Sequence, residues 1–215
     1  MESQVKNLGQ FAVLSGLPEL AFAQKAPRQV LRDEDCYALW DKYAMPENIR
    51  RHSRLVAHIA QILAELAMQR HFPVVAEEVR CSALLHDLGK SYSLRFGGSH
   101  SMLGAGWVVG ETHCYGIAKG VMHHVNWPWP VREDASICQL PILVMYADKR
   151  VSHDQGVTLA ERFQDLEQRY GISSEAKASL AASFEQILEI ERILAKVLGW
   201  EDLHAYSFNS RRLVY

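Results

Sequence analysis

The side chains best suited to chemistry in this sequence are His86 and Asp87, which are adjacent at the end of an apolar run and are followed by Leu88, Gly89 and Lys90. A histidine nitrogen and a carboxylate together suit a divalent metal such as manganese, iron, nickel or zinc. Adjacent helical residues point about 100° apart, so both reach one ion only if it lies between their directions. The same run also fits an ordinary helix C-terminus, with Gly89 after the last turn and Lys90 near the negative end of the dipole.

Other residues of the same chemical type stand on apolar faces of other predicted helices. His52 lies on such a stripe and also fits a structural core histidine. Asp148 lies on another, where a cation is the simplest explanation because a buried carboxylate without a partner is costly. His100 is at the start of a predicted helix and His123 is near the end of the next. Helices packed around one centre could bring these side chains together, as in bundle metal sites.

The elements that must position these residues are almost all helical. Capping residues and apolar spacing predict one short helix over Val5 to Leu14, a helical turn over Cys36 to Tyr43, and longer helices over Pro46 to about His71, Val74 to Leu88, from Ser99, Gly116 to Val125, Asp134 to Ser152, Thr158 to Tyr170, and from Ser173 or Ser174 to about Leu198. Pro141 either kinks the helix containing Asp148 or marks its true start. Ser91 to Gly98 is predicted to be a loop, and Asn126 to Pro130 a non-helical turn whose two tryptophans serve as a lid or as core cover.

Almost no β pattern appears, so the predicted fold is an all-α single helical domain, with six or more helices around a buried metal site. Residues 1–45 are expected to form an N-terminal helical cover. Residues 46–155 are expected to form the metal-binding core, and residues 156–215 to add C-terminal helices that complete the same domain. A chain of 215 residues can bury one sizeable core.

Composition limits the partners. The net charge is −2, with no basic excess, so no nucleic-acid groove is expected. The four cysteines lie far apart, which suits a reducing cytoplasm better than a disulfide framework. The N-terminus lacks a signal pattern, and no apolar run approaches the roughly 20 residues that span a membrane. We therefore expect a cytoplasmic protein without membrane association.

The order His52, His86-Asp87, Asp148 resembles the HD-domain superfamily of metal-dependent phosphohydrolases. The local sequence is similar too, in His52-Ser53 followed by Val56-Ala57, in Leu85 to Lys90, and in Ala147-Asp148-Lys149. The resemblance covers about residues 46 to 155. It implies an all-helical fold with a metal ion held by these four residues, and hydrolysis of a phosphate ester or anhydride, often of a nucleotide, by metal-bound hydroxide.

Two further histidines resemble ligands of a second metal. His100 and His123 stand where dinuclear members of the superfamily carry such ligands, as in enzymes that cleave symmetrical dinucleoside polyphosphates. The pair His123-His124 is also similar to the HD-GYP branch, which cleaves cyclic dinucleotides. However, Val125-Asn126-Trp127-Pro128 follows, with no Gly-Tyr-Pro, and this argues against that activity. The expected cofactor is a divalent ion (Mn, Fe, Ni, Co, Mg or Zn) at one tight site, with room for a second.

The chemistry assigns roles to individual residues. Asp87 could bridge two ions and Asp148 could orient the nucleophile, so both are expected to be catalytic together with Lys90. Lys90 and Arg150 could offset charge on phosphoryl oxygens, although Lys90 fits a helix cap equally well. His124 is a candidate substrate contact or acid. The expected partner is a small phosphorylated substrate, a nucleotide or dinucleotide, and a homo-oligomer is compatible with the sequence.

Two other functions use the same residues. HD-type di-iron oxygenases have the same ligand set, and the sequence does not separate them from hydrolases. A nucleotide-binding regulatory module without turnover is the third hypothesis. The complete set of buried carboxylates argues against it, because a degenerate module need not keep them.

Overall fold

The apolar stripe that follows Pro46 folds as the central helix of the core. This helix, α2, spans Glu47–Gln69, and its residues Leu55, Ile59 and Leu63 have no exposed surface. Their spacing of four places them on one face of the helix. Helices α3 (Ala76–Leu85) and α7 (Leu140–Lys149) pack against α2. The three helices that carry the main candidate residues are therefore neighbours.

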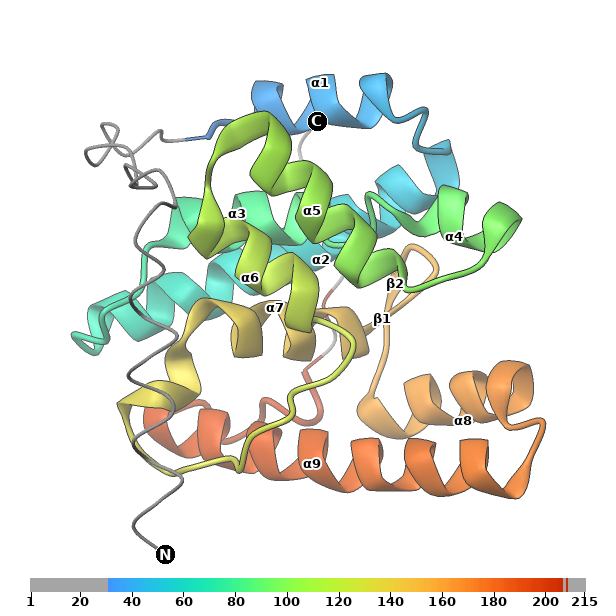
Figure 1. The fold of residues 1–215 in the computed structure, drawn as a ribbon. Helices are drawn as coiled ribbons and strands as arrows, with labels where there is room; N and C mark the ends of the chain where they lie inside the picture. The colour runs from blue at the N-terminus through green and yellow to red at the C-terminus, as the bar shows by residue number, and fades with distance from the viewer. Residues whose placement is uncertain (1–30, 207, 209–215) are drawn as a thin grey trace, which may run out of the picture.

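The structure is a computed structural model that describes residues 31–206 and 208 (Figure 1). Its remaining elements are α1 (Asp33–Lys42), α4 (Lys90–Phe96), α5 (His100–Thr112), α6 (Tyr115–His123), a 3₁₀ turn (Ala135–Cys138), β1 (Val151–Ser152), β2 (Gln155–Gly156), α8 (Leu159–Tyr170) and α9 (Ser174–Leu198). The two short strands pair antiparallel as a hairpin. The predicted all-α class is confirmed. The predicted helix over Val5 to Leu14 lies outside the described residues, and the division of the chain at residues 45 and 155 stays a prediction.

The helices form layers, with α1 on one side, α8 and α9 on the opposite side, and α7 between them (Figure 1). A buried hydrogen bond joins α7 to α9, in which the Tyr146 hydroxyl donates to Glu191 Oε2 over 2.6 Å. On the other side of the core, Trp40 Nε1 of α1 donates to the carbonyl oxygen of Leu84 over 2.9 Å. These contacts bind the outer layers to the helices that carry the candidate site.

Several predicted helix ends agree with the structure because the capping residues act locally. The Ser99 hydroxyl accepts from the Met102 N–H, and Ser173 caps α9. Thr158 and Glu161 form a capping box at the start of α8. Gly199 ends α9 with a φ of +61°, a conformation that glycine adopts without a side-chain penalty. Of the two options for Pro141, the structure shows the start of α7 in its first turn.

Three predicted boundaries were wrong. Ser91 to Gly98 is not a loop, because α4 runs over Lys90–Phe96 and ends only where Gly97 adopts a φ of +82°. The rings of Tyr92 and Phe96, one turn apart, pack 4.6 Å from each other along this helix. The turn predicted at Cys36 is a ten-residue helix that begins at Asp33, where acidic residues favour the positive end of the dipole. The helix predicted to reach Leu88 ends at Leu85, and His86 and Asp87 lie in the turn that follows.

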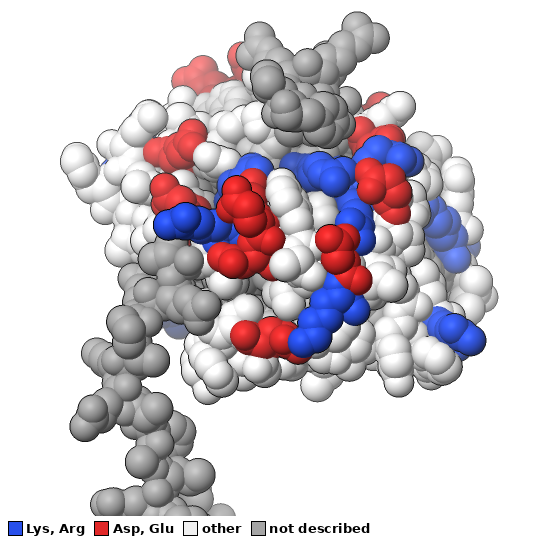
Figure 2. Space-filling model, turned by 90° about the horizontal axis from the view of Figure 1, so that it is seen from above, with Lys and Arg blue, Asp and Glu red and all other residues white. Residues whose placement is uncertain are grey.

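Charged side chains are mixed on the face that carries α1. Figure 2 shows basic and acidic groups side by side there, without a continuous basic stripe. Several form ion pairs, such as Lys42 with Glu111 and Arg50 with Asp41. Within the described part of the chain, no helix combines the length and the apolar character needed to cross a membrane.

Candidate metal centre

Four of the candidate residues meet in the core. His52 comes from α2, His86 and Asp87 from the turn after α3, and Asp148 from α7. His52 Nε2 lies 3.0 Å from Asp148 Oδ1, and His86 Nε2 lies 3.5 Å from Asp87 Oδ2 and 3.7 Å from Asp148 Oδ1. All four residues are buried. We call His52, His86, Asp87 and Asp148 the inner group.

Backbone carbonyls determine which ring nitrogen of each inner histidine is free. His52 Nδ1 lies 2.8 Å from the carbonyl oxygen of His153, and His86 Nδ1 lies 2.6 Å from that of Ala83. A carbonyl oxygen only accepts hydrogen bonds, so each Nδ1 must carry the proton. In the neutral ring, Nε2 then has a lone pair and no hydrogen. This is the usual arrangement of a histidine that binds a metal through Nε2.

These lone pairs point at negative groups, which is unfavourable without a cation between them. The lone pair of His52 Nε2 faces Asp148 Oδ1 at 3.0 Å, and this contact is attractive only with a proton or a metal ion between the two atoms. His86 Nε2 and Asp87 Oδ1 are buried and have no hydrogen-bond partner among the described residues. Unsatisfied buried polar atoms are rare because each loses its interaction with water. The inner group therefore fits a divalent cation bound by nitrogen and oxygen ligands.

The electrostatics keep these groups in the protonation states that a metal requires. Burial lowers the pKa of His86 to about 3, so the imidazole is neutral near pH 7. Burial alone would raise the pKa of Asp87, but the Lys90 ammonium holds it well below its ordinary value. For Asp148 the same effect of burial is outweighed by the Lys149 ammonium, and its pKa is also well below the ordinary value. Both carboxylates are therefore ionised.

A second set of donors shares Asp87 with the first. His100 Nε2 lies 3.3 Å from Asp87 Oδ1, His124 Nε2 lies 3.7 Å from the same oxygen, and the two Nε2 atoms are 3.1 Å apart. His124 Nδ1 donates to the carbonyl oxygen of Val121 over 2.7 Å, so in the neutral ring its Nε2 carries a lone pair and no proton. Burial lowers the pKa of His100 to about 4. We call Asp87, His100 and His124 the outer group, and these three side chains could hold a second ion.

Two glycines allow the outer group to form. A Cβ atom on Gly89 would lie 2.5 Å from the carbonyl oxygen of His100 and 3.0 Å from the backbone nitrogen of Gly104. The N-terminal part of α5 therefore approaches the turn after Asp87 more closely than a side chain would permit. On α5 the close approach occurs at Gly104, whereas Gly106 faces open space.

His123, predicted as a ligand of the second metal, is not in the outer group, and the structure places its neighbour His124 there. The His123 ring lies against Trp127 and Trp129, with centroid separations of 5.8 and 5.0 Å. Consecutive residues at the end of a helix point in different directions, so only one of the pair faces Asp87. His124 is 2% exposed, and this inward position suits a ligand rather than the substrate contact that the sequence suggested.

Arg150, predicted as a substrate contact, is buried and bonded to the C-terminal segment. Its guanidinium is fully buried and donates to the carbonyl oxygen of Leu203 at 2.7 Å and to the Tyr146 hydroxyl at 2.6 Å. It also pairs with Glu191 at 3.2 Å. Arg150 points toward the C-terminal segment because a buried guanidinium needs several acceptors, and those acceptors lie on that side of α7. It lines neither of the two cavities beside the site.

Two lysines stand beside the two carboxylates. Lys90 Nζ lies 2.9 Å from Asp87 Oδ2, and Lys149 Nζ lies 2.6 Å from Asp148 Oδ2. The sequence also allowed Lys90 to act only as a helix cap, but its ammonium group contacts the Asp87 carboxylate. Lys149 was not singled out from the sequence, although its position directly after Asp148 is the signal that could have identified it. Each lysine places a positive charge at the edge of the site.

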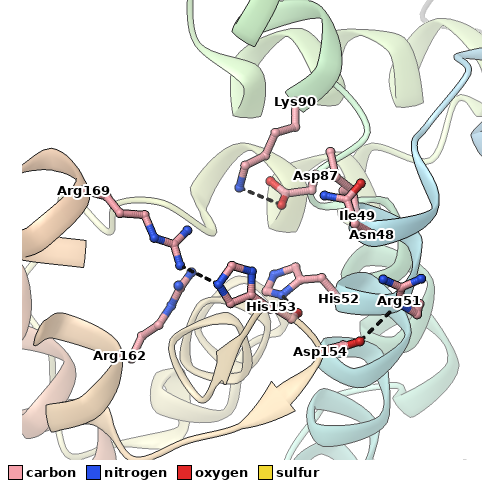
Figure 3. A pocket seen from close by; sticks show the side chains of 10 residues that line it. All are labelled: Asn48, Ile49, Arg51, His52, Asp87, Lys90, His153, Asp154, Arg162 and Arg169. Atoms are coloured by element: carbon pink, nitrogen blue, oxygen red, sulfur yellow. Dashed lines mark hydrogen bonds and ion pairs between the residues drawn. The ribbon is translucent and has the colours of Figure 1, made fainter. Parts of the chain in front are cut away.

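The site opens to two cavities that share Lys90, Arg162 and Arg169 as lining residues. The smaller cavity, of about 180 Å³, reaches His52 and Asp87, and Figure 3 shows Lys90 and the two arginines around it. The larger cavity, of about 710 Å³, is lined by His100, His124, Asp148 and residues of α8 and α9. Neither arginine was among the site residues predicted from the sequence. The two arginines are seven residues apart, which places them on one face of α8, and this spacing is the signal in the sequence that could have identified them.

Comparison with known proteins agrees with this geometry. A family model described as HD domain matches residues 49–152. Ribonuclease Y of Aquifex aeolicus (strain VF5) is 32% identical over 105 residues, which cover 46% of this chain. The matched part is 17% of that relative's length, so this chain corresponds to a small portion of it. No solved structure matches. The matched residues contain the whole inner group, and this part of the chain, residues 49–152, is an HD domain.

Proposed function

We propose that this protein hydrolyses a phosphate ester or anhydride of a small molecule, most simply a nucleotide or dinucleotide, with divalent metal ions held by the inner and outer groups. The observation that carries the proposal is the convergence of free Nε2 atoms and ionised carboxylates at the end of a cavity of about 710 Å³. In the inner group the proposed ligands are His52, His86, Asp87 and Asp148. In the outer group they are Asp87, His100 and His124.

A divalent ion at such a site lowers the pKa of a bound water toward neutrality and polarises a phosphoryl oxygen. The protein supplies the remaining parts. Lys90 and Lys149, beside the two carboxylates, are placed to bind non-bridging phosphoryl oxygens and to offset their charge. The surrounding helices bury both carboxylates, which strengthens these interactions because water is largely excluded. Asp148 Oδ1, facing His52, is the group proposed to orient the attacking water.

The proposed substrate class rests on the cavity and on the family. The larger cavity is lined by four cationic side chains and one carboxylate, which favours an anionic ligand. The relative's name, ribonuclease Y, describes an enzyme that cleaves phosphodiester bonds of RNA. Because so little of that relative is covered, we infer from it only a phosphate ester and propose a small substrate for this chain.

The test is a hydrolysis screen over nucleotides, dinucleotides, sugar phosphates and short oligoribonucleotides, with metal analysis of the same sample. Activity should vanish after thorough removal of metal and return with manganese, cobalt, nickel or magnesium. Unchanged activity in the demetallated protein would rule out the proposal. Bound iron with oxygen-dependent turnover would assign the protein to the oxygenases of this superfamily, and nucleotide binding without turnover in the metal-loaded protein would indicate a regulatory module.

A further inference from the structure

One face of α8 presents two arginines and one aspartate to the cavities. Arg162, Asp165 and Arg169 follow at intervals of three and four residues, so they lie above one another on the helix. Arg162 Nη1 donates to Asp165 Oδ2 at 3.1 Å, and Arg169 Nε donates to Asp165 Oδ1 at 2.8 Å. The Asp165 carboxylate thus orients both guanidinium groups. The one negative charge of Asp165 offsets only one of the two positive charges, so these three side chains carry a net positive charge.

Arg162 has unused hydrogen-bonding capacity in a buried position. The residue is 7% exposed, and its Nε has no hydrogen-bond partner among the described residues. A buried guanidinium N–H without an acceptor is unfavourable, and arginine cannot lose its charge to escape this. Arg162 lines both cavities, and in Figure 3 it approaches them from the same side as Arg169. The missing acceptor is therefore expected to come from an anionic molecule in the cavity.

These arginines form a cation set separate from the two lysines. Lys90 contacts Asp87 and Lys149 contacts Asp148, both in the inner group. The arginines pair instead with Asp165, a carboxylate on their own helix. In Figure 3, Lys90 enters from the top of the view, whereas the two arginines enter from the left. Helix α8 also lies outside residues 49–152, the part that matches the HD domain. The second cation set is thus a feature of this chain beyond its HD domain.

The β1–β2 turn connects the arginines to the inner group. Arg169 Nη2 donates to His153 Nε2 at 3.2 Å, and the carbonyl oxygen of the same His153 accepts from His52 Nδ1. The larger cavity is also lined by apolar side chains of α4, α8 and α9, including Leu94, Phe163, Leu166 and Leu180. A molecule in this cavity can therefore contact the lysines, the arginines and an apolar surface at once.

We propose that Arg162 and Arg169, oriented by Asp165, bind a second phosphoryl group of the substrate, so that the substrate class is an organic compound with at least two linked phosphoryl groups. This inference rests on the proposed function, which places the reacting phosphoryl group at the inner and outer groups. The second phosphoryl group accepts from Arg162, whose Nε has no acceptor among the described residues, and from the N–H groups of Arg169 that Asp165 does not occupy. The organic part contacts the apolar side chains of α4, α8 and α9.

The test compares binding of two non-hydrolysable probes, methylenediphosphonate and methylphosphonate, to the purified protein by calorimetry in one buffer. Arg162→Gln and Arg169→Gln should each weaken diphosphonate binding by at least about tenfold, the loss expected for a charge-assisted pair. The affinity for methylphosphonate should change much less. Arg192→Gln is the matched control, because Arg192 also pairs with a helix carboxylate, Glu189, but lines neither cavity.

Metal content and thermal unfolding of each variant separate loss of binding from loss of structure. The arginines provide no metal ligand, so metal content should equal that of the wild type. Arg169 is partly exposed, and Arg169→Gln keeps the test valid if the buried Arg162→Gln variant fails to fold. Arg162→Lys, which keeps the charge but not the fork, should bind the diphosphonate with intermediate affinity.

The outcomes distinguish this inference from the proposed function. Unchanged diphosphonate binding in both glutamine variants, or an equal loss with Arg192→Gln, would overturn the inference. An equal loss for both probes would show a single phosphoryl site and would overturn it too. If the expected pattern appears but no metal supports hydrolysis, the two-phosphoryl site stands and the proposed function fails. If metal-dependent hydrolysis occurs but the glutamine variants bind the diphosphonate as well as the wild type does, the proposed function stands and the two-phosphoryl site fails.

Discussion

The inner and outer groups use the same types of donor atom but are positioned in different ways. The inner residues come from α2, α7 and the turn after α3, and both of its histidines donate to backbone carbonyls. In the outer group, His100 stands at the first residue of α5 with 24% of its side chain exposed, beside the larger cavity. The inner group also contains two carboxylates, whereas the outer group has only the shared Asp87. A rigid, more anionic group should bind a divalent ion more tightly, so we expect unequal affinities.

The strongest test of this comparison is removal of the residue that the two groups share. Asp87→Ala should abolish binding of both ions and lower the turnover rate by about a thousandfold or more, equivalent to ~4 kcal/mol of transition-state stabilisation. Metal analysis and steady-state kinetics measure both effects. Asp41→Ala is the control, because this exposed carboxylate pairs only with Arg50 in the described contacts. Full metal occupancy at a normal rate would show that Asp87 is not a ligand.

Removal of an inner histidine should eliminate the tighter binding event. His52→Ala should lose most of the stabilisation that metal gives to the folded wild type, about 2.7 kcal/mol at a metal concentration a hundred times the Kd. Thermal unfolding with and without added manganese measures this difference. The control is His58→Ala, a histidine on the same helix that lines neither cavity. If the wild type and His52→Ala respond equally to metal, His52 does not belong to the tight site.

Removal of an outer histidine should have a smaller effect. His124→Ala and His100→Ala should each remove the weaker binding event in a metal titration, leave the tighter one, and reduce activity by about ten- to a hundredfold. His123→Ala should leave both events unchanged, because that ring packs on Trp127 and Trp129 instead. A wild-type protein that binds one equivalent of metal even with phosphate present would contradict the two-metal interpretation.

The smallest expected effect concerns the contact that places α5 beside the turn. Gly89→Ala should destabilise the protein by about 1–3 kcal/mol and weaken the outer group, because its Cβ would overlap the carbonyl oxygen of His100. Gly106, within α5, has open space around it, so Gly106→Ala should be neutral or stabilise the protein by up to ~1 kcal/mol. Urea unfolding measures both. Equal stability of the two variants would mean that the close approach is not required.

Much of this protein follows from local features of its sequence. The spacing of apolar residues predicted α2, because a stripe of one helix face needs no knowledge of its partners. Ser99, Thr158 and Gly199 marked helix ends through bonds to residues at most four positions away. The order of His52, His86-Asp87 and Asp148 led to the HD-domain superfamily, which the family match confirms. The ligand roles of these residues stay predictions.

The sequence alone determined the helices, the family and the kinds of donor atom, whereas the tertiary structure decided which side chains face the site. His123 and His124 are adjacent residues of the same type, so the sequence does not show which of them faces the site. The direction in which α6 ends brings His124, and not His123, toward Asp87. Arg150 is directed away from the cavities by acceptors 41 and 53 residues later in the chain. Arg162 and Arg169 join the site because α8 lies beside it. The physical reason is the same in each case: side-chain direction depends on contacts between distant segments, and local spacing contains no information about them.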